Sequence, residues 1–282
     1  MSCTGTKQAD LKTPVAPKIL KKLEKHKNIR EDYYYWLSQR DHPDVLKYLK
    51  EENSYQEEVL AETDELQKKL YKEMKKRITK ADSSVPYRYK SYSYYERTEE
   101  NSDYGIYCRK LNKPNSKEEI ILDSNLLAKN HDFFDVKSVE ISSHQKVLAY
   151  SYDTKGRRIY NVSLKDLETG KVTENILTDM TGDFQWAEDN KTIFYTKQDP
   201  TTLRSYQLWR YNISDKSHHL LYEEKDETFD LDLWKTKSNQ YIIVESSSTL
   251  SSEIRYLKAK KPKDELQIFA KRKRGLEYVV ED

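Results

Sequence analysis

The feature that most constrains the fold is a repeat of short apolar runs. Three of them begin at residues 147, 193 and 241, so successive starts are separated by 46 and 48 residues. A polar turn precedes each run, and two further strand-like segments follow it before the next turn. Several short strands in each unit of about 40 to 50 residues is typical of a β-propeller, whose blades are small antiparallel sheets. The 23 tyrosines also favour strands, because tyrosine suits a pleated, half-buried surface.

The repeat predicts four units, at residues 86–123, 136–177, 184–223 and 231–270, and residues 276–280 are expected to begin a fifth. No unit ends in Trp-Asp and the sequence has no Gly-Gly pair, so two common propeller signatures are missing. Propellers usually close by packing the last blade on the first. Four blades and the start of another therefore suggest an interrupted ring. The alternative is a ring closed by four blades, in which residues 276–282 would belong to no blade.

The region before the repeat has helical spacing instead. Apolar residues recur every three or four positions from Pro43 to about Lys80. Pro43 suits a first helical turn, and Thr63, which precedes two acidic residues, is expected to cap a second helix. We predict a mainly β protein with an N-terminal α-helical arm and a partial β-propeller of about four to five blades. Its segments are a disordered N-terminus at 1–13, the arm at 14–82 and the propeller at 83–282.

The sequence lacks the motifs of several enzyme classes. None of its six glycines is spaced as the Gly-x-Ser-x-Gly turn of an α/β-hydrolase, a Walker A loop or a dinucleotide-binding turn requires. It has no His-Glu-x-x-His and no Cys-x-x-Cys. We therefore expect no catalytic residue, no cofactor and no metal site in this chain.

Charge and location give weaker constraints. The net charge is +2, which gives no general attraction to nucleic acid or to an anionic membrane. The basic runs at 258–263 and 271–274 are interpreted as solvated loops; salt-sensitive binding would be needed to support a nucleic-acid binder instead. Residues 1–12 contain no apolar signal core, and no apolar run approaches the roughly 20 residues of a membrane helix. With only Cys3 and Cys108 present, we expect a cytoplasmic protein without nucleic-acid or membrane partners.

Several strings carry a resemblance to a known family. They are Tyr34-Tyr35-Trp36-Leu37, Glu52-Asn53-Ser54-Tyr55, Asp166-Leu167-Glu168-Thr169-Gly170, Trp186-Ala187-Glu188-Asp189 and Tyr206-Gln207-Leu208-Trp209-Arg210. Together, from about Pro14 to Asp282, they resemble the amino-terminal region of the prolyl oligopeptidase serine peptidases, in the oligopeptidase B branch. The resemblance implies a seven-bladed propeller over an α/β-hydrolase domain with a Ser-Asp-His triad. It also implies that the propeller admits only short peptides, which this branch cuts after Arg or Lys.

The resemblance also carries expectations for single residues. Arg157-Arg158, followed by Tyr160, matches a paired-arginine stretch of the branch and implies an interdomain contact for one of the two; a solvent-exposed turn is the alternative. The turn at 142–145 departs from the Ser-Pro-Asp-Gly-like turn of relatives, which puts its geometry in question. The aromatic run at 33–36 is implied to pack against the body of the enzyme, so its exposure would mark a missing partner.

Two functions follow from these observations. The leading hypothesis is the amino-terminal arm and gating propeller of an oligopeptidase B-like endopeptidase that cleaves short basic peptides. Its partner is the catalytic α/β-hydrolase domain, normally in the same chain, so these 282 residues are predicted to be inactive alone. The alternative is a non-catalytic propeller that binds peptides or proteins, which a monodisperse chain with a cooperative melt would favour.

Overall fold

The computed structural model describes residues 12–282, so the predicted disorder of residues 1–13 falls almost wholly outside the described part, as does Cys3. The chain divides into two compact units, residues 1–79 and 80–282. Each unit is built on a different local pattern, helical in the first and alternating in the second, as the change of periodicity predicts.

The first unit begins with a hairpin that the sequence did not predict. Strands β1 (Lys21–Lys25) and β2 (Asn28–Asp32) pair antiparallel around His26 and Lys27. Both turn residues have positive φ, +54° and +61°, which matches the handedness that a two-residue hairpin turn needs. Neither residue is the Asn or Gly that usually marks such a turn, and both strands are rich in charge. The sequence pattern therefore gave no indication of a hairpin here.

The predicted pair of helices is confirmed. After the 3₁₀ turn η1 (Tyr35–Ser38), helix α1 spans Pro43–Leu60, and α2 (Asp64–Arg77) follows the 3₁₀ turn η2 (Ala61–Thr63). Pro43 lies in the first turn, where its missing N–H costs nothing, and the His42 ring accepts a hydrogen bond from the Asp44 N–H. The expected cap at Thr63 is wrong. Its hydroxyl donates to the Leu60 carbonyl instead, at 2.7 Å.

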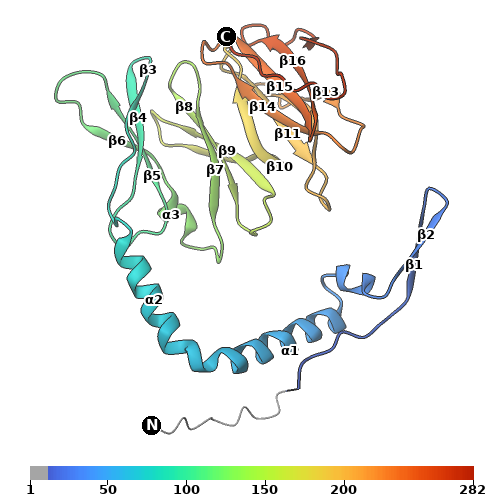
Figure 1. Ribbon diagram of the computed structural model, residues 1–282. Coiled ribbons are helices and arrows are strands. Elements are labelled where there is room, and N and C mark those ends of the chain that lie inside the picture. The colour runs from blue at the N-terminus through green and yellow to red at the C-terminus, as the bar shows by residue number, and fades with distance from the viewer. Residues whose placement is uncertain (1–11) are drawn as a thin grey trace. The chain divides into compact units, whose positions relative to one another are not determined.

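The second unit consists of four-stranded antiparallel blades connected in sequence order (Figure 1). Blade one contains β3 (Tyr87–Tyr89), β4 (Tyr92–Arg97), β5 (Ile106–Leu111) and β6 (Glu118–Asp123). Helix α3 (Ser124–Ala128) leads to blade two, which contains β7 (Asp135–Ile141), β8 (Val147–Asp153), β9 (Tyr160–Asp166) and the start of β10 (Val172–Trp186). Blade three contains the end of β10, β11 (Thr192–Gln198), β12 (Ser205–Asn212) and β13 (His218–Glu223). Blade four contains β14 (Asp230–Lys235), β15 (Tyr241–Ser248), β16 (Ser251–Lys258) and β17 (Gln267–Ile268). These four blades confirm the four sequence units.

Strand β10 belongs to two blades. Its first part pairs with β9 and its last part with β11, so it leaves blade two as the outer strand and enters blade three as the inner one. The crossing point is Gly182, with φ of +94°. A Cβ there would lie 2.6 Å from the Lys137 side chain and 2.9 Å from the Tyr160 ring. Only glycine satisfies both the backbone angle and this close approach.

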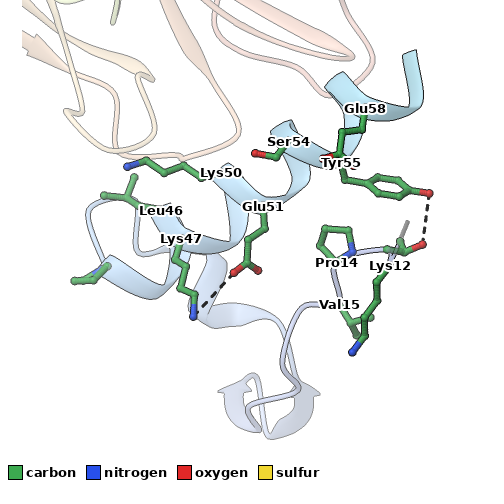
Figure 2. A pocket seen from close by; sticks show the side chains of 12 residues that line it. Lys12, Pro14, Val15, Leu46, Lys47, Lys50, Glu51, Ser54, Tyr55 and Glu58 are labelled. Carbon is green, nitrogen blue, oxygen red and sulfur yellow. Dashed lines mark hydrogen bonds and ion pairs between the residues drawn. The ribbon is translucent and has the colours of Figure 1, made fainter. Parts of the chain in front are cut away.

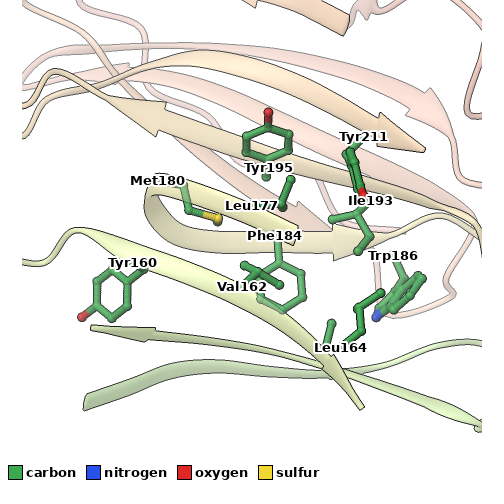
Figure 3. Close-up of a cluster of buried hydrophobic side chains, with 11 residues drawn as sticks. Tyr160, Val162, Leu164, Leu177, Met180, Phe184, Trp186, Ile193, Tyr195 and Tyr211 are labelled. Carbon is green, nitrogen blue, oxygen red and sulfur yellow. The ribbon is translucent and has the colours of Figure 1, made fainter. Parts of the chain in front are cut away.

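The core lies between successive blades. Figure 3 shows the cluster between blades two and three, where Val162, Met180, Phe184 and Trp186 are almost completely buried. Two similar clusters join blade one to blade two and blade three to blade four. Among the described residues, none of these clusters joins the fourth blade to the first. The partial propeller predicted from the sequence is therefore confirmed.

The turns between the first and second strands of the blades share one backbone feature. Each contains a residue with positive φ, +51° to +62°: Lys90, Gln145, Asn190 and Asn239. In the unusual turn at 142–145, Gln145 occupies this position, and its amide group donates to the Tyr89 carbonyl and to the Tyr94 hydroxyl. The Gln145 side chain therefore ties blade two to blade one.

Residues 276–280, expected to begin a fifth blade, form no strand. The segment runs beside blade four, because the Leu276 carbonyl accepts from the Ser252 N–H and the Asp282 carboxylate accepts from Ser238 at the opposite end of that blade. Its direction matches that of an inner strand. Without a following strand to pair with it in these residues, no ladder forms.

Candidate partner-facing surface

One end of the blades carries several exposed apolar side chains in its loops. In each blade the loop between the second and third strands and the connector to the next blade lie at the same end, because neighbouring strands are antiparallel. We call this end the loop face; it comprises loops 98–105, 154–159, 199–204 and 249–250 and connectors 124–134, 224–229 and 269–276. Its exposed large apolar residues are Leu126, Phe133, Leu250, Phe269 and Leu276.

The opposite end carries the inner turns, at 90–91, 142–146, 187–191 and 236–240. None of the residues in these turns is an exposed large apolar side chain. The loop face thus carries exposed apolar groups that the inner turns lack, a feature common on surfaces that contact another protein.

The predicted contact residues Arg157 and Arg158 lie on this face, in the loop between β8 and β9, and both are exposed. Within the described residues neither guanidinium group forms an ion pair, a hydrogen bond or a contact with an aromatic ring. The pair is therefore exposed on the loop face, and its interdomain contact stays a prediction.

An acidic cavity of about 690 Å³ opens at the junction of blades three and four, lined among others by Asp199, Glu223, Glu227 and Asp230. Arg204 also lines it, but its guanidinium group donates to the carbonyls of Glu224, Asp226 and Phe229. Burial, the largest single influence, raises the pKa of Glu224, but the hydrogen bonds from Arg272, the Asp226 N–H and the Tyr222 hydroxyl together outweigh it and lower the pKa of this carboxyl group. Arg204 and Arg272 thus hold the connector 224–229.

The first unit has its own uncovered surface. A groove of about 990 Å³ lies between residues 12–15 and helix α1, and Val15 and Leu46 are exposed in its lining (Figure 2). Lys47 and Glu51, which also line it, form an ion pair at 4.0 Å. On α2 and just beyond it, the apolar residues Leu66, Leu70, Met74 and Ile78 are exposed. A helical face that carries exposed apolar residues in this way is typical of an element that packs on a partner.

The aromatic residues 33–36, which precede α1, differ in burial. Trp36 is buried, and its ring N–H donates to the Pro17 carbonyl at 2.9 Å. Tyr33, Tyr34 and Tyr35 are each more than two-fifths exposed. The sequence therefore predicted the exposure of the tyrosines, but not the internal role of Trp36.

Two side-chain hydroxyl groups of the described residues lie within hydrogen-bond distance of an imidazole nitrogen, Ser142 beside His144 and Tyr195 beside His218, and neither imidazole is hydrogen-bonded to a described carboxylate. Within residues 12–282, no three His, Cys, Asp or Glu side chains gather as a metal site requires. The Tyr195 hydroxyl lies 2.9 Å from His218 Nδ1, but burial raises the pKa of Tyr195 and lowers that of His218. Tyr195 therefore keeps its proton near pH 7, and no described carboxylate is hydrogen-bonded to the His218 ring, as the orienting group of a catalytic triad would be. None of the described helices carries an apolar stretch of the length that a bilayer crossing requires.

Comparison with known families agrees with this architecture. Residues 14–282 match the model of the prolyl oligopeptidase N-terminal β-propeller domain. The chain belongs to this family. It is 34% identical over 280 residues to Protease 2 of Moraxella lacunata, covering 96% of this chain and 40% of that protein. It is 33% identical over 268 residues to dipeptidyl aminopeptidase BI of Pseudoxanthomonas mexicana, covering 88% of this chain and 37% of that one.

Comparison with solved structures supports the same family assignment. Oligopeptidase B from Leishmania major superposes with a TM-score of 0.86 at 27% identity, over 96% of this chain and 41% of that one. Oligopeptidase B from Trypanosoma brucei, in a closed form with covalently bound antipain, gives 0.82 at 25% identity. The chain spans about 40% of the length of these relatives. The 282 residues are the N-terminal propeller portion of an oligopeptidase B-like protein, and the family's catalytic domain is not among them.

Proposed function

We propose that this chain supplies the arm and the gating propeller of a serine endopeptidase that cleaves short peptides after Arg or Lys. In this proposal residues 14–82 form the arm, residues 83–282 form part of the gate, and the Ser-Asp-His triad belongs to a hydrolase domain outside these residues. The proposal rests above all on the close superposition with oligopeptidase B over 96% of this chain.

The loop face is the surface on which we propose that the hydrolase domain packs. The hydrolase domain would lie against this face, where the exposed apolar residues and the uncommitted Arg157 and Arg158 are found. Short basic peptides would be the substrates of the complete enzyme. We propose no nucleic-acid or membrane partner. A cytoplasmic location is supported by Cys108, which is a free, buried thiol.

A fusion tests the proposed function. Residues 1–282 are joined to the part of Moraxella lacunata Protease 2 that follows its matched region, and the purified fusion is given short peptides with and without Arg or Lys. We expect cleavage after Arg and Lys in the short peptides and no cleavage of a folded protein that contains the same sites, because the gate excludes it.

Intact Protease 2 serves as the control for the catalytic part. A fusion that melts cooperatively but cleaves neither class of peptide would contradict the proposal. Equal cleavage of short peptides and of the folded protein would contradict the gating role.

A further inference from the structure

The loop that carries Arg157 and Arg158 is held in an unusual backbone conformation. Arg158 has φ of +55° and Gly156 has φ of +70°. Left-handed backbone is unfavourable for a residue with a side chain, so it persists only where neighbouring groups fix it. The loop therefore needs anchors, and the structure identifies them.

The first anchor is Asp153, at the end of β8. Its side chain is 2% exposed and accepts the backbone N–H groups of Lys155 and Arg158, both at 2.7 Å. A carboxylate that accepts two backbone donors closes the loop onto its own strand.

The second anchor comes from the neighbouring blade. Gln198, at the end of β11, donates from Nε2 to the Arg158 carbonyl at 2.6 Å. Both backbone polar groups of Arg158 are thus engaged, and its side chain is the part that no described residue holds. On the other side of the loop, Gly156 packs against the ring of Phe133, where a Cβ would lie 3.5 Å away.

We propose that Asp153 and Gln198 are positioning residues, which hold loop 154–158 so that the guanidinium groups of Arg157 and Arg158 meet carboxylates on the hydrolase domain. The inference rests on the proposed function. Two guanidinium groups without an acidic partner in the described chain are complementary to a carboxylate-bearing surface. A loop fixed before contact loses less conformational entropy when the contact forms.

Hydrogen exchange in the isolated chain tests the anchoring without any partner. In Gln198→Ala, we expect the amides of residues 154–158 to exchange roughly five to ten times faster, because a hydrogen bond that fixes the loop is lost. Gln207→Ala is the matched control, since Gln207 is equally half-buried but bonds to Glu223 within its own blade. Unchanged exchange in Gln198→Ala would overturn the proposal, whether or not the fusion is active.

The fusion with Protease 2 tests whether the loop acts through the arginines. We expect Gln198→Ala to lower kcat/KM by about threefold to tenfold, and by less than about 1.5-fold when Arg157→Ala and Arg158→Ala are already present. The dependence of kcat/KM on ionic strength should weaken in parallel, because the contact is between charges. An equal effect of Gln198→Ala in both backgrounds would overturn the positioning role. An inactive fusion with the unaltered chain would instead count against the proposed function.

Discussion

Replacing Trp186 with alanine is expected to lower the free energy of unfolding of the propeller unit by about 3–5 kcal/mol. Trp186 is 1% exposed and lies in the cluster between blades two and three. Its ring N–H also donates to the Glu140 carbonyl at 3.2 Å, so the substitution leaves both a cavity and an unpaired acceptor. Denaturant unfolding followed by circular dichroism measures the loss.

Trp234→Ala is the matched control for this prediction. Trp234 lies on the inner strand β14 of blade four and is only partly buried. We expect less than half of the loss seen for Trp186. Equal losses at the two positions would contradict the prediction that burial between blades two and three causes the larger loss at Trp186.

Replacing Glu140 with glutamine is expected to stabilise the chain at alkaline pH. Burial raises the pKa of Glu140 from 4.5 to about 7, although Lys235 and Gln185 act in the opposite direction. A carboxyl group with a raised pKa binds its proton more tightly in the folded state, so folding is favoured at low pH and this advantage is lost as the pH rises through about 7. At pH 8 Glu140→Gln should gain about 3 kcal/mol.

The pH profile of stability separates this effect from a general one. Below pH 4.5 the wild-type chain and Glu140→Gln should be similar in stability, because the glutamate is then protonated in both folded and unfolded states. Glu174→Gln is the control, since Glu174 is exposed at the start of β10. A constant difference between pH 4 and pH 8, or none, would contradict the burial of this carboxyl group.

Much of the propeller could be predicted from the sequence because its signal is local. The sequence segments that form β8, β11 and β15 lie between polar turns, and their residues are wholly apolar or alternate between apolar and polar. This local pattern predicts a strand even when its pairing partners are unknown. The same pattern did not predict the β1–β2 hairpin, because its strands are charged and its turn residues, His26 and Lys27, are not typical of hairpins. The continuity of β10 through Gly182 was also hidden, since it depends on how two blades meet.

The candidate site was predictable only in part. The resemblance singled out Arg157 and Arg158, and an aspartate at the end of a strand before a short loop, as at Asp153, is a pattern that marks a side-chain-closed turn. Gln198 gave no such signal. It lies 40 residues beyond Arg158 in sequence, and only the packing of blade three against blade two brings it to the loop.

The most direct measurement of the central claim is peptide hydrolysis by the purified 282-residue chain alone. We predict no cleavage of short Arg- or Lys-containing peptides above the buffer rate, because these residues contain no glycine-framed serine turn. Turnover that rises in proportion to the concentration of the chain, and that is blocked by a serine-reactive inhibitor, would contradict the account.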